Sequence, residues 1–307
     1  MPFRSSISPF LNGFALLALL LATAGCSAKR PPDPQYQAAG NLLEIVKDFQ
    51  RLVREDQYRF PIPKDVTGVN IAKATLVRLD DYEKGHPGGL SEIVDFSKAM
   101  AYERLRDYNQ AMVYYHKVAE SNGRLGEQAK KNIEAVQAFQ DILQKPLPSR
   151  DPFEYVRAMD EKVQALTELS RTHQGTPYEF LALVEEERLD RAKVAFAELN
   201  RSRLQNGNQL VIVGYTQLIT KHKESKNLNS HLLDFGDYYV KLAKEYTAQN
   251  DPEGLNFDME VFNELAKSAL KYYTEVAQQD GVTEKMEAEG KIKSLQALTE
   301  KIGSLQR

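Results

Sequence analysis

The stretch Ala111-Met-Val-Tyr-Tyr-His-Lys-Val-Ala119 recurs as Ala269-Leu-Lys-Tyr-Tyr-Thr-Glu-Val-Ala277, with five of nine positions identical. In each copy an alanine is followed four residues later by a tyrosine, and a valine comes three residues after that. Side chains at this spacing share one face of an α-helix. The small residue lets a neighbouring helix approach closely, and the ring fills the adjacent space. Because one helix cannot bury such a face alone, the repeat predicts stacked helices that complete each other's core.

Helical periodicity extends through most of the chain. Apolar residues recur three and four positions apart, and strand-like alternation is absent. The sequences Asp151-Pro-Phe-Glu154 and Thr176-Pro-Tyr-Glu179 each combine a capping oxygen, a proline and a glutamate in the order of a capping box. We therefore predict an all-α fold of about eleven helices, near residues 37–58, 66–84, 89–104, 107–120, 125–144, 151–173, 177–205, 208–223, 228–249, 256–279 and 283–305.

The residues around the first copy resemble the second half of a tetratricopeptide repeat. Tyr102 stands late in one predicted helix, Tyr108 follows an aspartate in a tight turn, and Ala111, Tyr115 and Val118 have the packing spacing of the second helix. The resemblance implies a right-handed α-solenoid of antiparallel helix hairpins. An ordinary helical bundle is the alternative.

The second copy is a more divergent unit of the same kind. Ala269, Tyr273 and Val276 take the packing positions, but the tight turn before them is missing. An insertion through residues 251–256 leaves a longer second helix. The direct resemblance therefore covers about a third of the chain.

The resemblance also implies a partner-binding groove lined by the first helices of successive hairpins. When Tyr102 and Ala111 are aligned with the family's pattern, the groove positions of the family correspond to Ile93, Phe96 and Met100, with Glu103 at the rim of the groove. An amphipathic helix or an extended apolar segment would fit such a surface. Packing of Phe96 and Met100 in ordinary core is the alternative.

The N-terminus has the organisation of an export signal. An apolar run from Phe10 to Ala24 is too short to span a bilayer and ends at Cys26, the only cysteine of the chain. Leu21-Ala-Thr-Ala-Gly-Cys26 resembles the lipobox of bacterial lipoproteins, although Thr23 replaces the usual leucine. The resemblance implies cleavage before Cys26 and a covalent N-terminal lipid on its thiol. An ordinary secretory signal with a leftover cysteine is the alternative.

Three segments follow from these features. Residues 1–25 form the predicted lipoprotein signal peptide, 26–36 a proline-rich flexible tether, and 37–307 the helical domain, with possible halves at 37–145 and 150–307. Ser27 stands where inner-membrane lipoproteins of the resembled family carry an aspartate. The resemblance therefore implies anchoring in the outer membrane, facing the periplasm.

Composition argues against several functional classes. The chain has 40 Lys and Arg against 43 Asp and Glu, a net charge of −3, and no long basic run, so a nucleic-acid partner is not expected. We expect no catalytic residue, metal site or cofactor apart from the lipid, since nucleotide-binding and nucleophile motifs are absent. Glu185-Glu-Glu187 is interpreted as a solvated helix face. The histidines share no metal-ligand spacing; they are His86, His116, His173, His222 and His231.

We therefore expect an envelope adaptor that binds another protein. Lipoproteins of the resembled type include a helical subunit that helps assemble outer-membrane β-barrels and the pilotins of secretion and pilus rings. A peptidoglycan-acting enzyme or a carbohydrate-binding lipoprotein remains the alternative. A carboxylate with a raised pKa inside a pocket would favour the enzyme, and an open apolar groove between helices would favour the adaptor.

Overall fold

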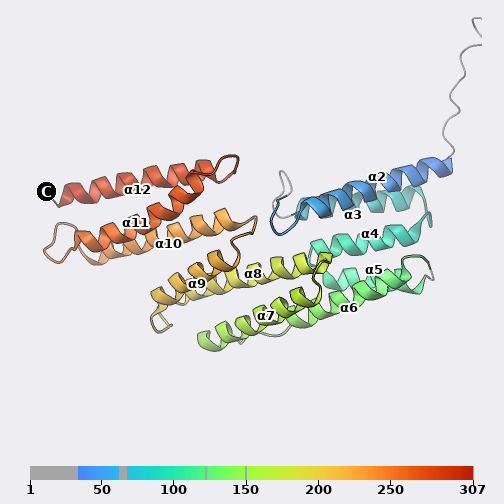
Figure 1. Cartoon of the computed structure of the whole chain (residues 1–307), viewed down its shortest axis with the longest axis horizontal. Coiled ribbons are helices and arrows are strands. Elements are labelled where there is room, and N and C mark those ends of the chain that lie inside the picture. The colour runs from blue at the N-terminus through green and yellow to red at the C-terminus, as the bar shows by residue number, and fades with distance from the viewer. Residues whose placement is uncertain (1–33, 62–67, 122, 149–150, 307) are drawn as a thin grey trace, which may run out of the picture.

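Eleven α-helices make up the part of the chain that the structure describes (Figure 1). The structure is a computed structural model, and it describes residues 34–61, 68–121, 123–148 and 151–306. Within these ranges no β-strand occurs, so the all-α prediction is confirmed. The helices are α2 (Pro34–Glu55), α3 (Val69–Gly85), α4 (Ser91–Arg104), α5 (Tyr108–Glu120), α6 (Gly126–Leu143), α7 (Pro152–Thr172), α8 (Pro177–Leu199), α9 (Gly207–Lys221), α10 (Leu228–Gln249), α11 (Met259–Ala277) and α12 (Lys285–Leu305).

Helices that follow one another in the chain pack against one another in space. The most extensive contacts are those of α10 with α11, α7 with α8, α4 with α5 and α5 with α6. Figure 1 shows an elongated molecule with α2 to α6 towards one end, α10 to α12 at the other, and α8 crossing the middle. This consecutive packing confirms the predicted solenoid-like arrangement.

The predicted helix caps form at two starts, but the boxes are incomplete. Asp151 Oδ1 accepts a hydrogen bond from the Phe153 N–H at 2.8 Å, and Thr176 Oγ1 accepts one from the Tyr178 N–H at 3.3 Å. The reciprocal glutamate bonds differ from the prediction. Glu154 pairs with Arg157 instead, and Glu179 accepts from the Gly175 N–H, one residue before the cap.

Several predicted boundaries differ from the observed ones by three residues or more, and two of them have a local explanation. The helix predicted to begin at residue 37 begins at Pro34, because proline is tolerated in the first turn of a helix. The helix predicted to reach residue 205 ends at Leu199, where the Asn200 side chain bonds the Phe196 carbonyl at 2.9 Å. A tight turn follows. A Cβ on Gly207 would overlap the Arg201 carbonyl group, so only glycine fits there.

The largest apolar cluster lies in the region of α4 to α8. Tyr115, Phe139 and Leu166 are fully buried in it, and it contains side chains from both sides of the 145–150 boundary. A separate cluster around Leu42, Leu79 and Val94 belongs to α2, α3 and α4. A third surrounds Tyr273 and joins α10, α11 and α12. The core is therefore a series of local clusters along the length of the molecule.

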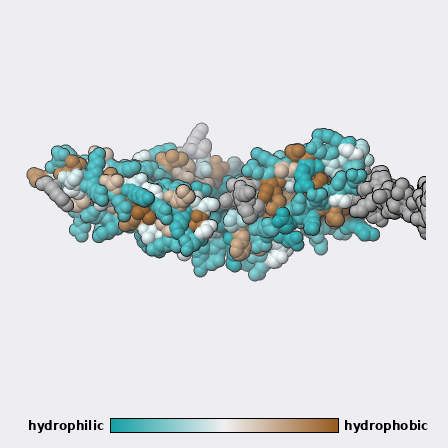
Figure 2. Space-filling view, turned by 90° about the horizontal axis from the view of Figure 1, so that it is seen from above, coloured by the Kyte–Doolittle hydropathy of each residue, from teal (hydrophilic) through white to brown (hydrophobic). Residues whose placement is uncertain are grey.

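The face of the molecule that Figure 2 presents is predominantly hydrophilic. Figure 2 shows small hydrophobic patches separated by hydrophilic side chains on the face in view. Among the helices described, none has the length and apolar content needed to cross a bilayer.

Candidate functional site

The predicted lipid-attachment residue, Cys26, lies outside the described residues, as do residues 1–25 and the tether up to residue 33. Lipidation, signal cleavage and membrane attachment therefore stay predictions. The site described below belongs to the helical domain.

The residues predicted to line a groove on α4 occupy different environments. Ile93 is 36% exposed. Phe96 and Met100 are half-buried and pack against the large central cluster. The Phe96 ring meets the Tyr115 ring edge to face, with 5.4 Å between centroids. Phe96 and Met100 thus contribute to the core of the α4–α5 hairpin.

Glu103, the predicted rim residue, is held inside the helix stack. Its Oε1 accepts a hydrogen bond from the Tyr178 hydroxyl of α8 at 2.7 Å. Burial raises the pKa of the Glu103 carboxyl to about 7, and the hydrogen bond from Tyr178 only partly opposes this effect. Such a pKa suits a general acid, but this carboxyl is engaged by a neighbouring helix and does not line the trough described next.

The predicted repeat-packing residues lie largely in the interior. Tyr102 is half-buried and stacks on Tyr114 with 5.5 Å between ring centroids. The other members are at most 7% exposed; they are Tyr108, Ala111, Tyr115, Val118, Ala269, Tyr273 and Val276.

An extended hollow forms a trough between α7 and α9, with α8 as its floor. Three adjoining hollows form it, and all three share Asp160. We call this surface the α7–α9 trough. The residues that line it are Phe153, Val156, Arg157, Asp160, Glu161, Val163, Gln164, Ala165, Thr167, Glu168 and Arg171 of α7, Asp190, Lys193, Val194 and Ala197 of α8, Leu204, and Leu210, Val213, Gly214, Thr216, Gln217, Thr220 and Lys221 of α9.

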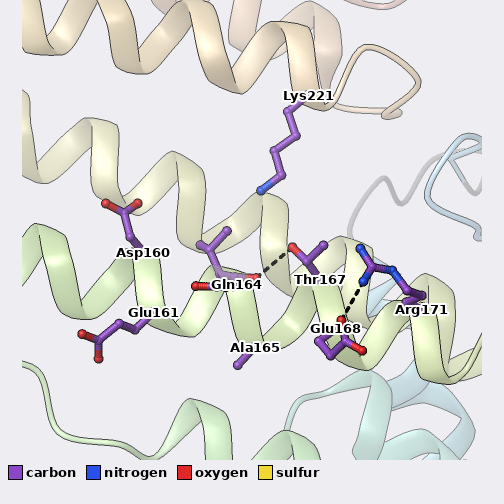
Figure 3. A pocket seen from close by; sticks show the side chains of 9 residues that line it. Asp160, Glu161, Gln164, Ala165, Thr167, Glu168, Arg171 and Lys221 are labelled. Carbon is purple, nitrogen blue, oxygen red and sulfur yellow. Dashed lines mark hydrogen bonds and ion pairs between the residues drawn. The ribbon is translucent and has the colours of Figure 1, made fainter.

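One end of the trough is charged (Figure 3). Lys221 reaches from α9 towards α7 and pairs with Glu186 at 2.5 Å and Asp190 at 2.9 Å. Arg171 pairs with Glu168 on α7 at 2.8 Å. Since these charges already pair with one another, this end of the trough has no strong positive or negative electrostatic potential.

The other end of the trough is apolar. Phe153, Leu210 and Val213 are 53%, 42% and 39% exposed. A Cβ on Gly214 would lie 3.0 Å from a methyl carbon of Val194, so glycine lets α9 approach α8 closely here. The hollow at this end measures about 400 Å³. Exposed apolar side chains along a concave surface are suited to an apolar segment of a partner.

The expectation for Glu185, Glu186 and Glu187 is wrong, because these side chains are buried at 0%, 2% and 3% exposure. Three consecutive helical residues span about 200° of the helix, so all three are buried only if neighbours cover most of α8. Glu185 pairs with Arg106 at 2.5 Å and Arg188 at 2.8 Å. Buried carboxylates are found where such partners compensate the loss of hydration.

Glu187 is enclosed by α10 and the connection before it. Its Oε1 accepts from the Ser225 hydroxyl at 2.5 Å and faces His231 Nε2 at 2.6 Å, and its Oε2 accepts from Asn227 at 3.2 Å. Burial alone raises the pKa of Glu187, but these hydrogen bonds, led by that of His231, lower it overall. His231 Nδ1 is buried without a hydrogen-bond partner among the described residues.

Asp190 is enclosed by α9. It faces His222 Nε2 at 3.0 Å, and His222 Nδ1 is hydrogen-bonded to the Tyr58 hydroxyl at 2.7 Å. Burial by itself raises the pKa of the Asp190 carboxyl, but hydrogen bonds from His222 and Lys221 outweigh it and lower the pKa to about 2. The carboxylate therefore stays ionised across the physiological range.

Sequence reasoning missed this carboxylate cluster, although one signal was present. Glu185 stands three residues after Ala182 and four before Leu189, which places it on an apolar face of α8. Nothing local indicates the partners of the cluster, because His222 and His231 follow more than thirty residues later. Within the described ranges, no three His, Cys, Asp or Glu side chains are arranged to hold a metal ion.

Comparison of the chain with protein-family models, curated proteins and solved structures finds no match.

Proposed function

We propose that this protein is a lipid-anchored envelope adaptor that binds an apolar segment of another envelope protein in the α7–α9 trough. Its role is binding without catalysis. The lipid on Cys26 would hold the chain at the outer membrane, facing the periplasm, and the helical domain would present the trough.

The trough is the observation that carries this proposal. It is open, it lies between helices, and its apolar end exposes Phe153, Leu210 and Val213. An amphipathic helix laid between α7 and α9 would bury these side chains against α8. This placement differs from the groove expected on α4, where Phe96 and Met100 already pack in the core.

Crosslinking in the intact envelope tests the proposal. A photoreactive amino acid at Gln217, in the trough, should give a discrete adduct with one envelope protein, identified by mass spectrometry. The same group at His116, which is exposed on α5, should not give that adduct. Equal adducts from both positions would contradict trough binding.

Substitutions separate binding from stability. Phe153→Ser with Leu210→Ser should abolish the adduct while leaving the melting temperature nearly unchanged, since both side chains are about half exposed. The matched control is Val77→Ser with Val113→Ser, which removes apolar groups of 59% and 49% exposure away from the trough. Loss of the adduct in the control would point to a general surface effect.

The lipid anchor has its own test. Cys26→Ser should leave an unprocessed precursor of higher mass. An intact wild-type mass with no acyl groups would contradict the lipoprotein prediction.

A further inference from the structure

The segment that follows α2 contacts the α9–α10 connection, far away in the sequence. The Tyr58 hydroxyl is hydrogen-bonded to His222 Nδ1, 164 positions along the chain. The Lys226 N–H donates to the Tyr58 carbonyl at 2.8 Å. The Lys226 ammonium pairs with the Asp56 carboxylate. Three polar contacts thus join the N-terminal hairpin, formed by α2 and α3, to the connection between α9 and α10.

These contacts are shielded from water. Asp56 and Tyr58 are each 6% exposed, His222 is 1% exposed, and the Lys226 side chain is 8% exposed. Arg104 of α4 adds a second cation 3.7 Å from the Asp56 carboxylate. Because these side chains are buried, their contacts differ from exposed surface ion pairs, which contribute little to stability.

The interface is also connected to the carboxylates of α8. His222 binds Tyr58 through Nδ1 and faces Asp190 through Nε2, so its neutral form donates to the carboxylate and accepts from the hydroxyl. Ser225 and Asn227, in the same connection, bond Glu187. The α9–α10 connection is therefore held from two sides, by α8 and by the segment after α2.

One ring contact adds apolar packing to this junction, because the buried Tyr58 ring meets the His222 ring edge to face with 6.0 Å between centroids. The cluster around Leu42, Leu79 and Val94 belongs to α2, α3 and α4, and Phe60, just beyond the junction, is 63% exposed. Polar and ionic contacts exchange for hydration when they open, so their net contribution is far smaller than their gross strength. Tyr58 belongs to none of the apolar clusters named above, so the junction can open by exposing this one ring while those clusters stay intact.

We propose that Asp56, Tyr58, His222 and Lys226 form a polar latch that closes the N-terminal hairpin onto the α9–α10 connection and thereby fixes the α9 wall of the trough. Lys221, the last residue of α9, lines the trough and directly precedes His222. Opening of the latch frees the C-terminal end of α9 and changes the width of the trough. The latch is a property of the chain itself and does not depend on what the trough binds.

Distance measurements between spin labels test the latch in the full-length chain. Replacing Cys26 by Ser removes the only thiol. Gln50→Cys with Glu224→Cys places labels at exposed positions on either side of the latch, and Glu161→Cys with Thr220→Cys places them across the trough. Each pair is measured with the latch intact and with Asp56→Asn, Tyr58→Phe and Lys226→Met combined.

In the latch variant, both distance distributions should broaden and gain a longer component, while helix content stays unchanged. The matched control is Arg191→Met with Asp234→Asn, which removes a 2.8 Å ion pair between α8 and α10 away from the latch and should leave both distributions as in the wild type. Unchanged distributions in a folded latch variant would overturn the proposal.

A milder variant keeps the test decisive if the combined variant fails to fold. Tyr58→Phe removes only the hydroxyl that binds His222. It should shift a smaller fraction of molecules to the longer distance across the latch. Tyr58→Phe with wild-type distances would mean that the segment is fixed by packing, and the latch would be rejected.

Discussion

Tyr115 in α5 and Tyr273 in α11 occupy the same position of the repeated sequence, yet their surroundings differ. Both rings are buried, at 0% and 2% exposure, beside alanines at 0%. The Tyr115 hydroxyl makes no well-formed hydrogen bond among the described residues, although Glu103 and Tyr178 lie close to it. The Tyr273 hydroxyl donates to Asp237 at 2.6 Å. The repeat thus sets the position of the ring, and the neighbouring helices decide what its polar end meets.

The contacts of the two rings differ as well. Tyr115 meets the edge of Phe96 on α4. Tyr273 lies over Gly236 on α10, where a Cβ would overlap the ring carbon Cε1. The first unit therefore buries its ring against another ring, and the second unit buries it against bare backbone. A divergent copy can keep the same helix face while changing the residue that fills the opposing space.

Removing either ring should have the largest effect. Tyr115→Ala and Tyr273→Ala should each lower the free energy of unfolding by about 3–5 kcal/mol, because each leaves a cavity in a closely packed interface. Denaturant unfolding followed by circular dichroism measures both. A cost below about 1 kcal/mol for one of them would mean that the two positions are not equivalent.

The pH dependence of stability should distinguish the first unit from the second. Glu103, close to Tyr115, has a pKa of about 7 in the folded protein because it is buried. The folded state therefore keeps a proton that the unfolded chain releases above its ordinary value of 4.5, and stability falls as the pH rises from 4.5 to 7. At 1.36 kcal/mol per pKa unit, this loss amounts to about 3 kcal/mol.

Glu103→Gln should remove that loss, since the amide oxygen still accepts from Tyr178 and carries no charge. The variant should be more stable than the wild type at pH 8 and nearly equal to it at pH 4. Glu120→Gln, an exposed change on α5, serves as the control and should leave the pH profile unchanged. Parallel pH profiles for Glu103→Gln and the wild type would contradict the raised pKa.

Gly236 gives a sharper test of the second unit. Gly236→Ala should destabilise by about 1–3 kcal/mol, because the new methyl group overlaps the buried Tyr273 ring. Gly290 on α12 is the matched control, because a methyl group added there would meet nothing within 4 Å. Gly290→Ala should stabilise by about 0.5–1 kcal/mol through the helix preference of alanine. Thermal melts of both variants decide whether the close approach at Gly236 exists.

Local sequence could predict the helices and the repeat, because spacing within one helix determines which side chains share a face. Tyr115 and Tyr273 are examples, and the capping oxygens of Asp151 and Thr176 are others. The burial of Glu185 to Glu187 could not be predicted in this way. Three adjacent acids suggest a solvated helix, and their burial depends on Arg106, Lys221 and residues of the α9–α10 connection.

The α7–α9 trough could not be predicted from local sequence patterns either. Its apolar side chains are few per helix, and they become one surface only when α7 and α9 flank α8. The predicted groove positions on α4 followed the register of one unit. In the structure, Phe96 and Met100 pack against the central apolar cluster, and the Glu103 carboxyl is hydrogen-bonded to Tyr178 of α8. Register predicts a helix face, and tertiary neighbours decide whether that face is free.

The smallest predicted effect isolates the hydroxyl groups of the two tyrosines. Tyr273→Phe should cost about 1 kcal/mol, because it removes a hydrogen bond to a carboxylate that is half exposed and also held by Lys291 at 2.8 Å. Tyr115→Phe should be neutral or slightly stabilising, because the buried hydroxyl that it removes makes no well-formed hydrogen bond. Both changes keep the ring, so packing is constant. Equal costs in denaturant unfolding would mean that the two hydroxyls have similar surroundings, and the difference between the units would then rest on Phe96 and Gly236 alone.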